Sequence, residues 1–462
     1  MTTESRSYFA AQAWIDGAWA RDVLLSVDAA GRWSRVLSDC SATQRASAEV
    51  LKGAVVPGLV NAHSHAFQRA IAGLSERRGA ASSDDFWSWR DRMYSVARRI
   101  SPDQLEAIAS FLYAELLEAG YTQVCEFHYV HNAVDGAPDA DPLEMSLALV
   151  RAAQKVGIGL TLLPTLYMRS GFGATGLRED QRRFASTPDS VLRLREGLLR
   201  QGAQAPNFNV GVALHSLRAA DMAAIRETSA VVAAAGEPIH IHIAEQTQEV
   251  QDCLAATGQR PIEHLLSNVA LNSQWNLVHA THTTLQELQG VQQSGASIVI
   301  CPSTEANLGD GVFDFSGYAA CAGQWSIGSD SHVTRRWTEE LRLLEYSQRF
   351  MQRRRNVAAQ GAVSDSSAAA LFESALAGGR TASGRTLGGI KVGNRADFLV
   401  LDEQSSALLG VPADCLLDAL VFSSPDARFS EVFVAGQKRC SGPELSASLA
   451  PGFVHTMNAL WR

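Results

Sequence analysis

Short apolar runs recur through the middle of this chain, and stretches with the periodicity of amphipathic helices separate several of them. Runs that end at glycine, proline or polar clusters are typical of buried β-strands. We predict eight such strands, at residues 55–60, 122–127, 159–166, 209–214, 238–243, 275–278, 297–301 and 324–328. The clearest helices are predicted at residues 102–119, 142–156, 190–201 and 338–353. This alternation indicates an α/β fold, a (β/α)8 TIM-like barrel.

The two ends of the chain have a different character. Residues from about 8 to 56 contain short β-strands and turns at Asp16-Gly17 and Ala30-Gly31, with little helical periodicity. Residues 396–402 and 430–436 also read as strands. We therefore predict that residues 1–56 and 386–462 together form a small β-sandwich domain, and that residues 57–385 form the barrel.

Composition narrows the class of protein. With 46% hydrophobic and 19% charged residues, the chain can bury a large core. A net charge of -8 argues against a nucleic-acid partner and against an anionic membrane surface. The seven cysteines form no C-x-x-C pair, and we find no signal peptide and no apolar run that could span a membrane. These features predict a cytoplasmic protein.

Four of the predicted strands end in residues that can bind a metal or transfer a proton. His63 and His65 follow the first strand at spacing i, i+2, so both side chains point the same way on an extended chain. The other ends carry His242, Glu245, His279 and Asp330. In a barrel the carboxyl ends of all strands meet at the active-site face. One such residue could be structural, but their recurrence predicts a metal centre with an acid/base group.

Three further histidines have weaker claims to this site. His240 and His242 share one face of their strand, and His242 is nearer the carboxyl end, so we assign His242 to the metal. His240 is interpreted as a buried histidine one layer lower. His282 and His332 are expected in loops.

The chain resembles the amidohydrolase superfamily over nearly its whole length, including the split terminal β-domain. The resemblance rests on Pro-Gly-x-Val-Asn-x-His-x-His, then His-x-x-Glu, then an isolated His, then Gly-Ser-Asp. It implies that a divalent metal is bound by His63, His65, His242 and Asp330. It also implies catalytic roles for Glu245 and His279.

Binuclear members of that superfamily commonly bridge their ions with a carboxylated lysine, whereas this chain has no lysine between Lys155 and Lys391. We therefore expect one divalent metal per chain, with zinc favoured by the ligand types and Fe2+, manganese or cobalt as alternatives. A metal lowers the pKa of bound water towards about 7. Asp330 and His279 would orient the hydroxide for attack on a C=N carbon, and Glu245 would pass a proton to the departing nitrogen.

Arginines near the barrel mouth indicate an acidic substrate. Arg90 ends an aromatic-rich segment, residues 84–90, that we interpret as a loop, and Arg218 follows the strand at 209–214. Paired hydrogen bonds from arginine suit a carboxylate, so two separated arginines suggest a small dicarboxylate. The alternative is that both are solvated surface residues.

Six local strings resemble the superfamily members that hydrolyse N-formimidoyl-L-glutamate to N-formyl-L-glutamate and ammonia in histidine degradation. They lie at residues 63–70, 86–90, 126–131, 215–218, 240–246 and 303–310. The resemblance implies substrate contacts by Gln68, Arg90, Tyr129, His215 and Arg218, and it suggests a homodimer. The alternatives are another mononuclear deaminase or chlorohydrolase acting on a guanidine, purine or triazine, and a non-catalytic barrel serving as a scaffold.

Overall fold

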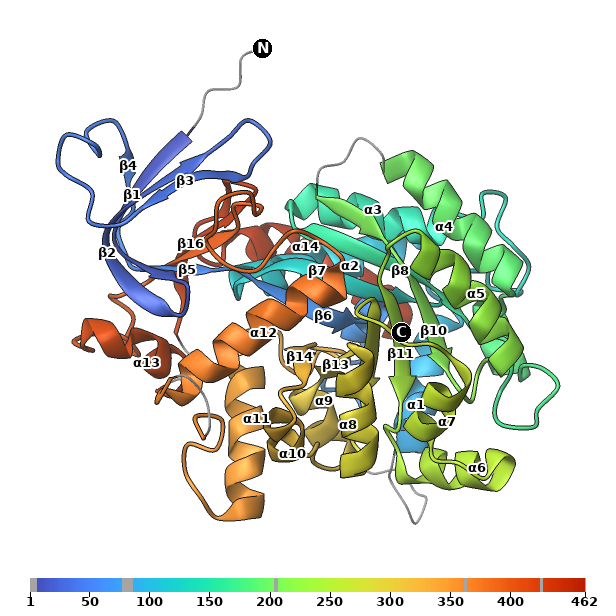
Figure 1. The fold of residues 1–462 in the computed structure, drawn as a ribbon. Coiled ribbons are helices and arrows are strands. Elements are labelled where there is room, and N and C mark those ends of the chain that lie inside the picture. Colours follow the sequence, from blue (N-terminus) through green and yellow to red (C-terminus); the bar gives the residue numbers. More distant parts are fainter. Residues whose placement is uncertain (1–5, 77–85, 203–206, 361–363, 424–426, 462) are drawn as a thin grey trace.

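The computed structural model of this protein describes residues 6–76, 86–202, 207–360, 364–423 and 427–461. Within these residues the strands form two sheets, one parallel and surrounded by helices, the other mostly antiparallel and set to one side (Figure 1). The predicted barrel with a small β-domain from both chain ends is therefore confirmed.

The parallel sheet is the barrel wall. Its strands are hydrogen-bonded in the order β14-β13-β12-β11-β10-β8-β7-β6, and β9 adds a short pairing to β8. β8 and β13 are buried along their whole length, as parallel strands covered by helices are. The bounds are β6 (Leu59–Ser64), β7 (Tyr121–His128), β8 (Gly159–Leu166), β9 (Phe208–Val210), β10 (Val212–Ser216), β11 (Ile239–Ile243), β12 (Trp275–His279), β13 (Ser297–Ile300) and β14 (Gln324–Ile327).

Helices follow the barrel strands and continue into the C-terminal part. Helix α2 could be predicted because its N-terminus carries typical helix-start residues: Pro102 is its first residue, and Ser101 and Gln104 form a capping box. No helix in the described part is long and apolar enough to cross a membrane. The helices are α1 (Phe86–Ala97), α2 (Pro102–Glu118), α3 (Glu144–Val156), α4 (Pro188–Gly202), α5 (Met222–Ala234), α6 (Thr247–Thr257), α7 (Pro261–Asn268), α8 (Leu285–Ser294), α9 (Pro302–Leu308), α10 (Phe315–Ala320), α11 (Trp337–Gln352), α12 (Ser367–Ser383), α13 (Leu416–Phe422) and α14 (Glu444–Trp461), with 3-10 turns η1 (Ala66–Ala70), η2 (Glu179–Phe184) and η3 (Ala413–Cys415).

The second sheet combines strands from both ends of the chain in the order β17-β16-β15-β5-β1-β2-β3, with β4 paired to β1. Its core includes Tyr8, whose ring packs edge-on against Phe398 and Phe433 from the C-terminal strands. The bounds are β1 (Arg6–Ile15), β2 (Ala18–Val27), β3 (Trp33–Leu37), β4 (Glu49–Val50), β5 (Val55–Pro57), β15 (Phe398–Leu401), β16 (Phe429–Val434) and β17 (Gln437–Cys440).

One predicted strand, residues 55–60, is divided between the two sheets. β5 pairs with β1 and β15 in the small sheet, whereas β6 pairs with β7 in the barrel. The change occurs at Gly58, where a Cβ would lie 2.3 Å from the Thr122 side chain. An apolar run shows that a segment is buried but not which sheet it joins, so this division was not visible in the sequence.

Candidate active site

The barrel closes where the candidate metal ligands lie. β6 and β14 end the sheet, and an isolated parallel bridge between Ser64 and Asp330 joins them. The Asp330 N–H donates to the His63 carbonyl oxygen at 3.0 Å. Gly328 is required at this junction, because a Cβ there would lie 2.5 Å from the Cβ of His63. Closure of the barrel therefore brings the last strand against the first histidine pair.

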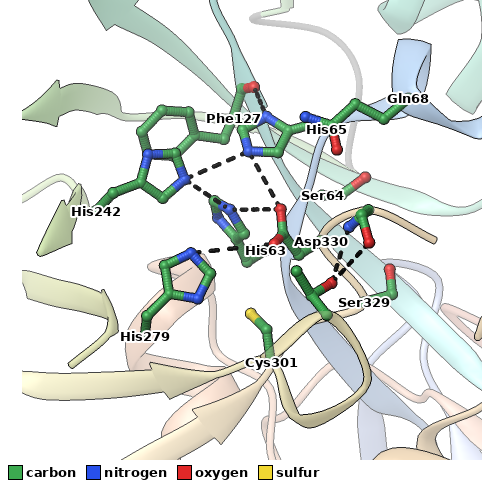
Figure 2. A network of polar contacts seen from close by, with 12 residues as sticks. His63, Ser64, His65, Gln68, Phe127, His242, His279, Cys301, Ser329 and Asp330 are labelled. Carbon is green, nitrogen blue, oxygen red and sulfur yellow. Dashed lines mark hydrogen bonds and ion pairs between the residues drawn. The ribbon is translucent and has the colours of Figure 1, made fainter. Parts of the chain in front are cut away.

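Three imidazoles and one carboxylate converge at this closure (Figure 2). The Nε2 atom of His242 lies 3.0 Å from Nε2 of His63 and 3.4 Å from Nε2 of His65. The Oδ1 atom of Asp330 lies 3.3 Å from Nε2 of His63 and 3.4 Å from Nε2 of His65. All four side chains are buried. The structure thus brings together the four residues that the sequence assigned to a metal.

The hydrogen bonds of these histidines leave nitrogen lone pairs facing one another. His65 Nδ1 lies 2.8 Å from the Phe127 carbonyl oxygen, and His242 Nδ1 lies 3.0 Å from the His215 carbonyl oxygen. Each Nδ1 therefore carries the proton, and Nε2 is an acceptor. Burial lowers the pKa of His63 to about 3 and also lowers the pKa of His65 and His242, so the rings are neutral. Converging lone pairs repel unless a cation lies between them, so this donor set fits a divalent metal.

Two more donors lie at the edge of this cluster. The ligand atoms of His279, Cys301 and Asp330 lie within 4.8 Å of one another, as do those of His63, His242 and His279. Geometry alone therefore permits His279 as a ligand as well as a catalytic group. Burial would raise the pKa of Asp330, but contact with His63 and the nearby imidazoles lowers it, so the carboxylate is ionised. Burial and neighbouring carboxylates raise the pKa of the Cys301 thiol, which is neutral at pH 7.

Glu245 and His279 face each other beside this cluster. Glu245 Oε1 lies 3.7 Å from His279 Nε2, which is 4.0 Å from Asp330 Oδ2. Burial would lower the pKa of His279, but Glu245, Glu305 and Asp330 raise it to about 10. Burial raises the pKa of Glu245, although His279 and Arg218 oppose this effect. A carboxyl group with a raised pKa beside a buried imidazole is suited to proton transfer.

The backbone at the strand ends is strained. Five non-glycine residues have φ between 43° and 72°, in the left-handed region: Ala244, His279, Ala280, Asp330 and His332. Such conformations cost about 1–3 kcal/mol each and cluster at functional sites, where the surrounding structure holds them. Three of the strand ends singled out from the sequence carry this strain.

A pocket adjoins the cluster, and all five residues assigned to the substrate line it: Gln68, Arg90, Tyr129, His215 and Arg218. The same pocket is lined by His65, His242, Glu245, His279 and Asp330. Residues predicted for substrate binding and for chemistry therefore share one cavity.

Arg90 lies on helix α1, so the loop predicted at residues 84–90 is wrong where the structure describes it. The segment contains no glycine or proline, and Met93, Tyr94 and Ala97 are buried at helical spacing. The loop prediction stopped at residue 90, before this periodicity could be seen. Asp84 and Asp85 lie outside the described residues. The Arg90 guanidinium lies 5.5 Å from the centre of the Tyr94 ring.

Side chains from separate segments fix the remaining pocket groups. Gln68 on η1 donates to the Tyr129 hydroxyl at 3.3 Å. Gln181, which is fully buried on η2, donates to the hydroxyls of Tyr94 and Tyr167 at 3.1 and 3.0 Å. These bonds join α1, η1, η2 and the ends of β7 and β8 around the pocket.

The other histidines lie outside the pocket lining. His240 is fully buried, and its Nε2 lies 2.9 Å from the Ala382 carbonyl oxygen on α12. His282 Nε2 lies 2.8 Å from the Asp310 carbonyl oxygen, in a loop after β12. His332 is buried in the turn after β14, where its Nε2 lies 3.1 Å from the carbonyl oxygen of His65.

Three buried glutamates behind the site were missed in the sequence. Glu126 accepts hydrogen bonds from Ser64 Oγ at 2.7 Å and Ala66 N–H at 2.6 Å, and burial raises its pKa to about 8. It thus holds both neighbours of His65. Glu305 lies 3.6 Å from His279 Nδ1, and Glu249 contacts the Glu245 backbone. Glu126 and Glu305 lie within the strings at residues 126–131 and 303–310, and Glu249 lies four residues after Glu245 at the start of a helix, but no pattern assigned a role to any of the three.

Comparison with known proteins gives a consistent picture. The model of the Amidohydrolase family matches residues 54–439. Formimidoylglutamate deiminase of Pseudomonas aeruginosa is 46% identical over 95% of this chain and 96% of its own length. A crystal structure of an amidohydrolase from Brucella melitensis has a TM-score of 0.93 and 40% identity, over 99% of this chain and 100% of that one. An adenosine deaminase from Xanthomonas campestris with bound zinc has a TM-score of 0.81 and 20% identity over 98% of both chains, which shows a shared fold.

Proposed function

Since this chain belongs to the amidohydrolase family, we propose that it is a metal-dependent deiminase that hydrolyses N-formimidoyl-L-glutamate to N-formyl-L-glutamate and ammonia, a step of histidine degradation. The relative named formimidoylglutamate deiminase is aligned over nearly the full length of both chains, which supports the same reaction here.

One structural observation carries the substrate assignment. Arg90 and Arg218 line the same pocket as Glu245, His279 and Asp330, so two cations face the chemistry across one cavity. Both arginines are partly or largely buried, so neither is an ordinary surface residue. A buried guanidinium that opens onto a pocket suits a carboxylate ligand, and two of them suit a dicarboxylate.

The proposed chemistry is the addition of water to the formimidoyl carbon. His63, His65, His242 and Asp330 would hold one divalent metal, which supplies Lewis acidity when bound and makes water nucleophilic near neutral pH. His279 and Asp330 hydrogen-bond to the attacking oxygen and aim it at the carbon. Glu245 accepts a proton from that oxygen.

Collapse of the tetrahedral carbon then completes the reaction. Glu245 returns its proton to the terminal nitrogen, because ammonia leaves far more easily than an amide anion. Glu245 then moves the remaining proton of the hydroxyl oxygen to the same nitrogen, which leaves as ammonia while the C–N bond to it breaks and the C=O bond of the formyl group forms. Arg90 and Arg218 hold the two carboxylates, and Gln68, Tyr129 and His215 border the reacting group, so the carbon is fixed relative to the water.

We propose one zinc ion per chain as the cofactor. Three neutral imidazole nitrogens and a carboxylate oxygen form the mixed ligand set that zinc accepts at catalytic sites, and Fe2+ is the main alternative. The lack of any lysine between Lys155 and Lys391 leaves no carboxylated lysine to bridge a second ion.

The test is ammonia release by the metal-loaded protein from N-formimidoyl-L-glutamate, alongside guanine, cytosine and linear guanidino acids. We expect rapid release from the formimidoyl compound, with N-formyl-L-glutamate identified as the product by NMR. Turnover of a ring substrate, with none of the formimidoyl compound, would contradict the proposal.

A further inference from the structure

Glu249 is a buried carboxylate that contacts both halves of the proposed site without lining the pocket. It lies in the first turn of α6 and is fully buried. Its Oε2 accepts a hydrogen bond from the Glu245 N–H at 3.1 Å, and the same oxygen lies 3.9 Å from Arg218 Nε. Among the described residues the pocket lining includes Glu245 and Arg218 but not Glu249.

Arg218 lies between two carboxylates. Its Nη2 is 3.7 Å from Glu245 Oε2, while its Nε faces Glu249. The Arg218 side chain is only 12% exposed, and a buried cation needs a nearby anion to offset its lost hydration. Glu245 cannot be that anion throughout the proposed reaction, because it becomes neutral when it accepts a proton. Glu249 does not line the pocket and takes no part in that proton transfer.

We propose that Glu249 is a positioning residue that ties the substrate-binding Arg218 to the acid/base Glu245. Its charge holds the guanidinium in place, and its hydrogen bond to the Glu245 N–H fixes the turn after β11 in which Ala244 has a φ of 52°. One carboxylate would thereby set the spacing between the substrate's carboxylate and the proton-transfer group. This inference rests on the proposed function of the site.

Two substitutions separate the two contacts. Glu249→Gln keeps a carbonyl oxygen for the Glu245 N–H but removes the charge behind Arg218. We expect KM to rise about tenfold or more, because Arg218 loses a buried carboxylate 3.9 Å from its Nε, with kcat within about threefold of the parent. Glu249→Ala also removes the acceptor, so kcat should fall about a further tenfold. Parent kinetics in Glu249→Gln would overturn the proposal.

A double substitution tests whether Glu249 acts through Arg218. In Arg218→Met the guanidinium is gone, so adding Glu249→Gln should change KM less than twofold more. Effects that multiply would mean that the two residues act independently and would also overturn the proposal. Glu287→Gln is the matched control. Glu287 is likewise buried in the first turn of a helix, α8, and pairs with Arg260 at 2.8 Å outside the pocket, so its loss should leave kcat and KM unchanged.

A readout without substrate separates this inference from the proposed function. In protein labelled with 15N-arginine, the Nε–H signal that disappears in Arg218→Met belongs to Arg218. Glu249→Gln should shift or broaden that signal, whereas Glu287→Gln should leave it in place.

Metal content and melting temperature, measured on the same samples, show whether Glu249→Gln still folds. If Glu249→Gln does not fold, Glu249→Asp should fold, because it keeps the charge, and its KM should lie closer to that of the parent. An unmoved signal in a folded Glu249→Gln overturns the inference even if the enzyme is active. A moved signal in a protein without deiminase activity leaves this contact standing and removes the proposed function.

Discussion

The two sides of the pocket are built in different ways. We call the proposed metal ligands His63, His65, His242 and Asp330 the metal floor, and the proposed substrate contacts Gln68, Arg90, Tyr129, His215 and Arg218 the substrate wall. Metal-floor residues lie on or within three residues of barrel strands, are buried, and have backbone carbonyls or neighbouring ligands as partners. Among the substrate-wall residues, Gln68 lies on η1 and Arg90 on α1, whereas Tyr129, His215 and Arg218 lie on or within three residues of β7 or β10. Side chains, rather than backbone carbonyls, are the partners of Gln68, Tyr129 and Arg218.

This difference indicates what each side can tolerate. A metal-floor ligand is fixed by the sheet itself, so a change there should disturb the metal and with it all chemistry. A substrate-wall residue can change while the strands stay in place. Its loss should therefore alter substrate recognition and leave the metal bound.

Loss of a metal-floor ligand should have the largest effect. Asp330→Ala and His242→Ala should purify with far less than one metal ion per chain, measured by elemental analysis. Their rate of ammonia release should fall by more than roughly 10²–10⁴-fold, which is the contribution of one acid/base group. Treating the parent protein with a chelator should give the same loss, and added zinc should reverse it. His240→Gln is the control, since His240 lies two residues before His242 but faces Ala382. Full metal content in Asp330→Ala would show that Asp330 is not a metal ligand. Two ions per chain in the parent protein would contradict the expectation of one metal, which rests on the missing lysine.

Glu245 stands between the two sides, and its substitution tests whether the metal floor is complete without it. Glu245→Gln should keep the ion and a similar KM, because the amide has nearly the same shape. Its kcat should fall about 10²–10⁴-fold, because the amide cannot shuttle a proton. Steady-state kinetics and elemental analysis on the same samples measure both quantities. Loss of the ion would instead make Glu245 a ligand.

Arginine substitutions test the substrate wall alone. Arg90→Met and Arg218→Met keep most of the stem and remove the charge, so the protein should fold and retain its metal. A lost charged hydrogen bond costs about 1.5–3 kcal/mol, so kcat/KM should fall roughly 10–150-fold. An analogue lacking one carboxylate should discriminate less between the parent and the variant whose arginine faced the missing group. Parent rates in both variants would leave the dicarboxylate assignment without support.

The smallest effect is expected one step behind the substrate wall. Gln181→Leu removes the amide that donates to the Tyr94 and Tyr167 hydroxyls, while both tyrosines still line the pocket. Neutral hydrogen bonds contribute about 0.5–1.5 kcal/mol, so kcat/KM should fall about three- to tenfold with unchanged metal content. A loss as large as that of an arginine variant would show that the substrate wall depends on these supporting hydrogen bonds as strongly as on its arginines.

The metal-floor residues could be predicted from the sequence because the residue patterns that indicate them are local. Two histidines at i, i+2 after an apolar run share a face whatever the rest of the chain does. The barrel rule then places the ends of β6, β11, β12 and β14 at one face, so His242 and Asp330 could be added to the floor, and His279 placed beside it, without coordinates. In the substrate wall, position near the barrel mouth indicated only Arg90 and Arg218, and the resemblance to known enzymes added Gln68, Tyr129 and His215. No spacing along the chain links Arg90 to Arg218.

From the sequence we could predict the strands, the barrel that they form, and the residues at their carboxyl ends. These follow from periodicity and chain direction, which each segment carries alone. Tertiary contacts were needed to show that β5 and β6 part at Gly58 and that Glu126, Glu249 and Glu305 stand behind the reacting groups. Each of these depends on contacts between segments far apart in sequence, where a few ångströms settle whether a buried carboxylate meets a histidine, an arginine or a backbone N–H. That spacing is fixed by packing, and no short stretch of sequence contains it.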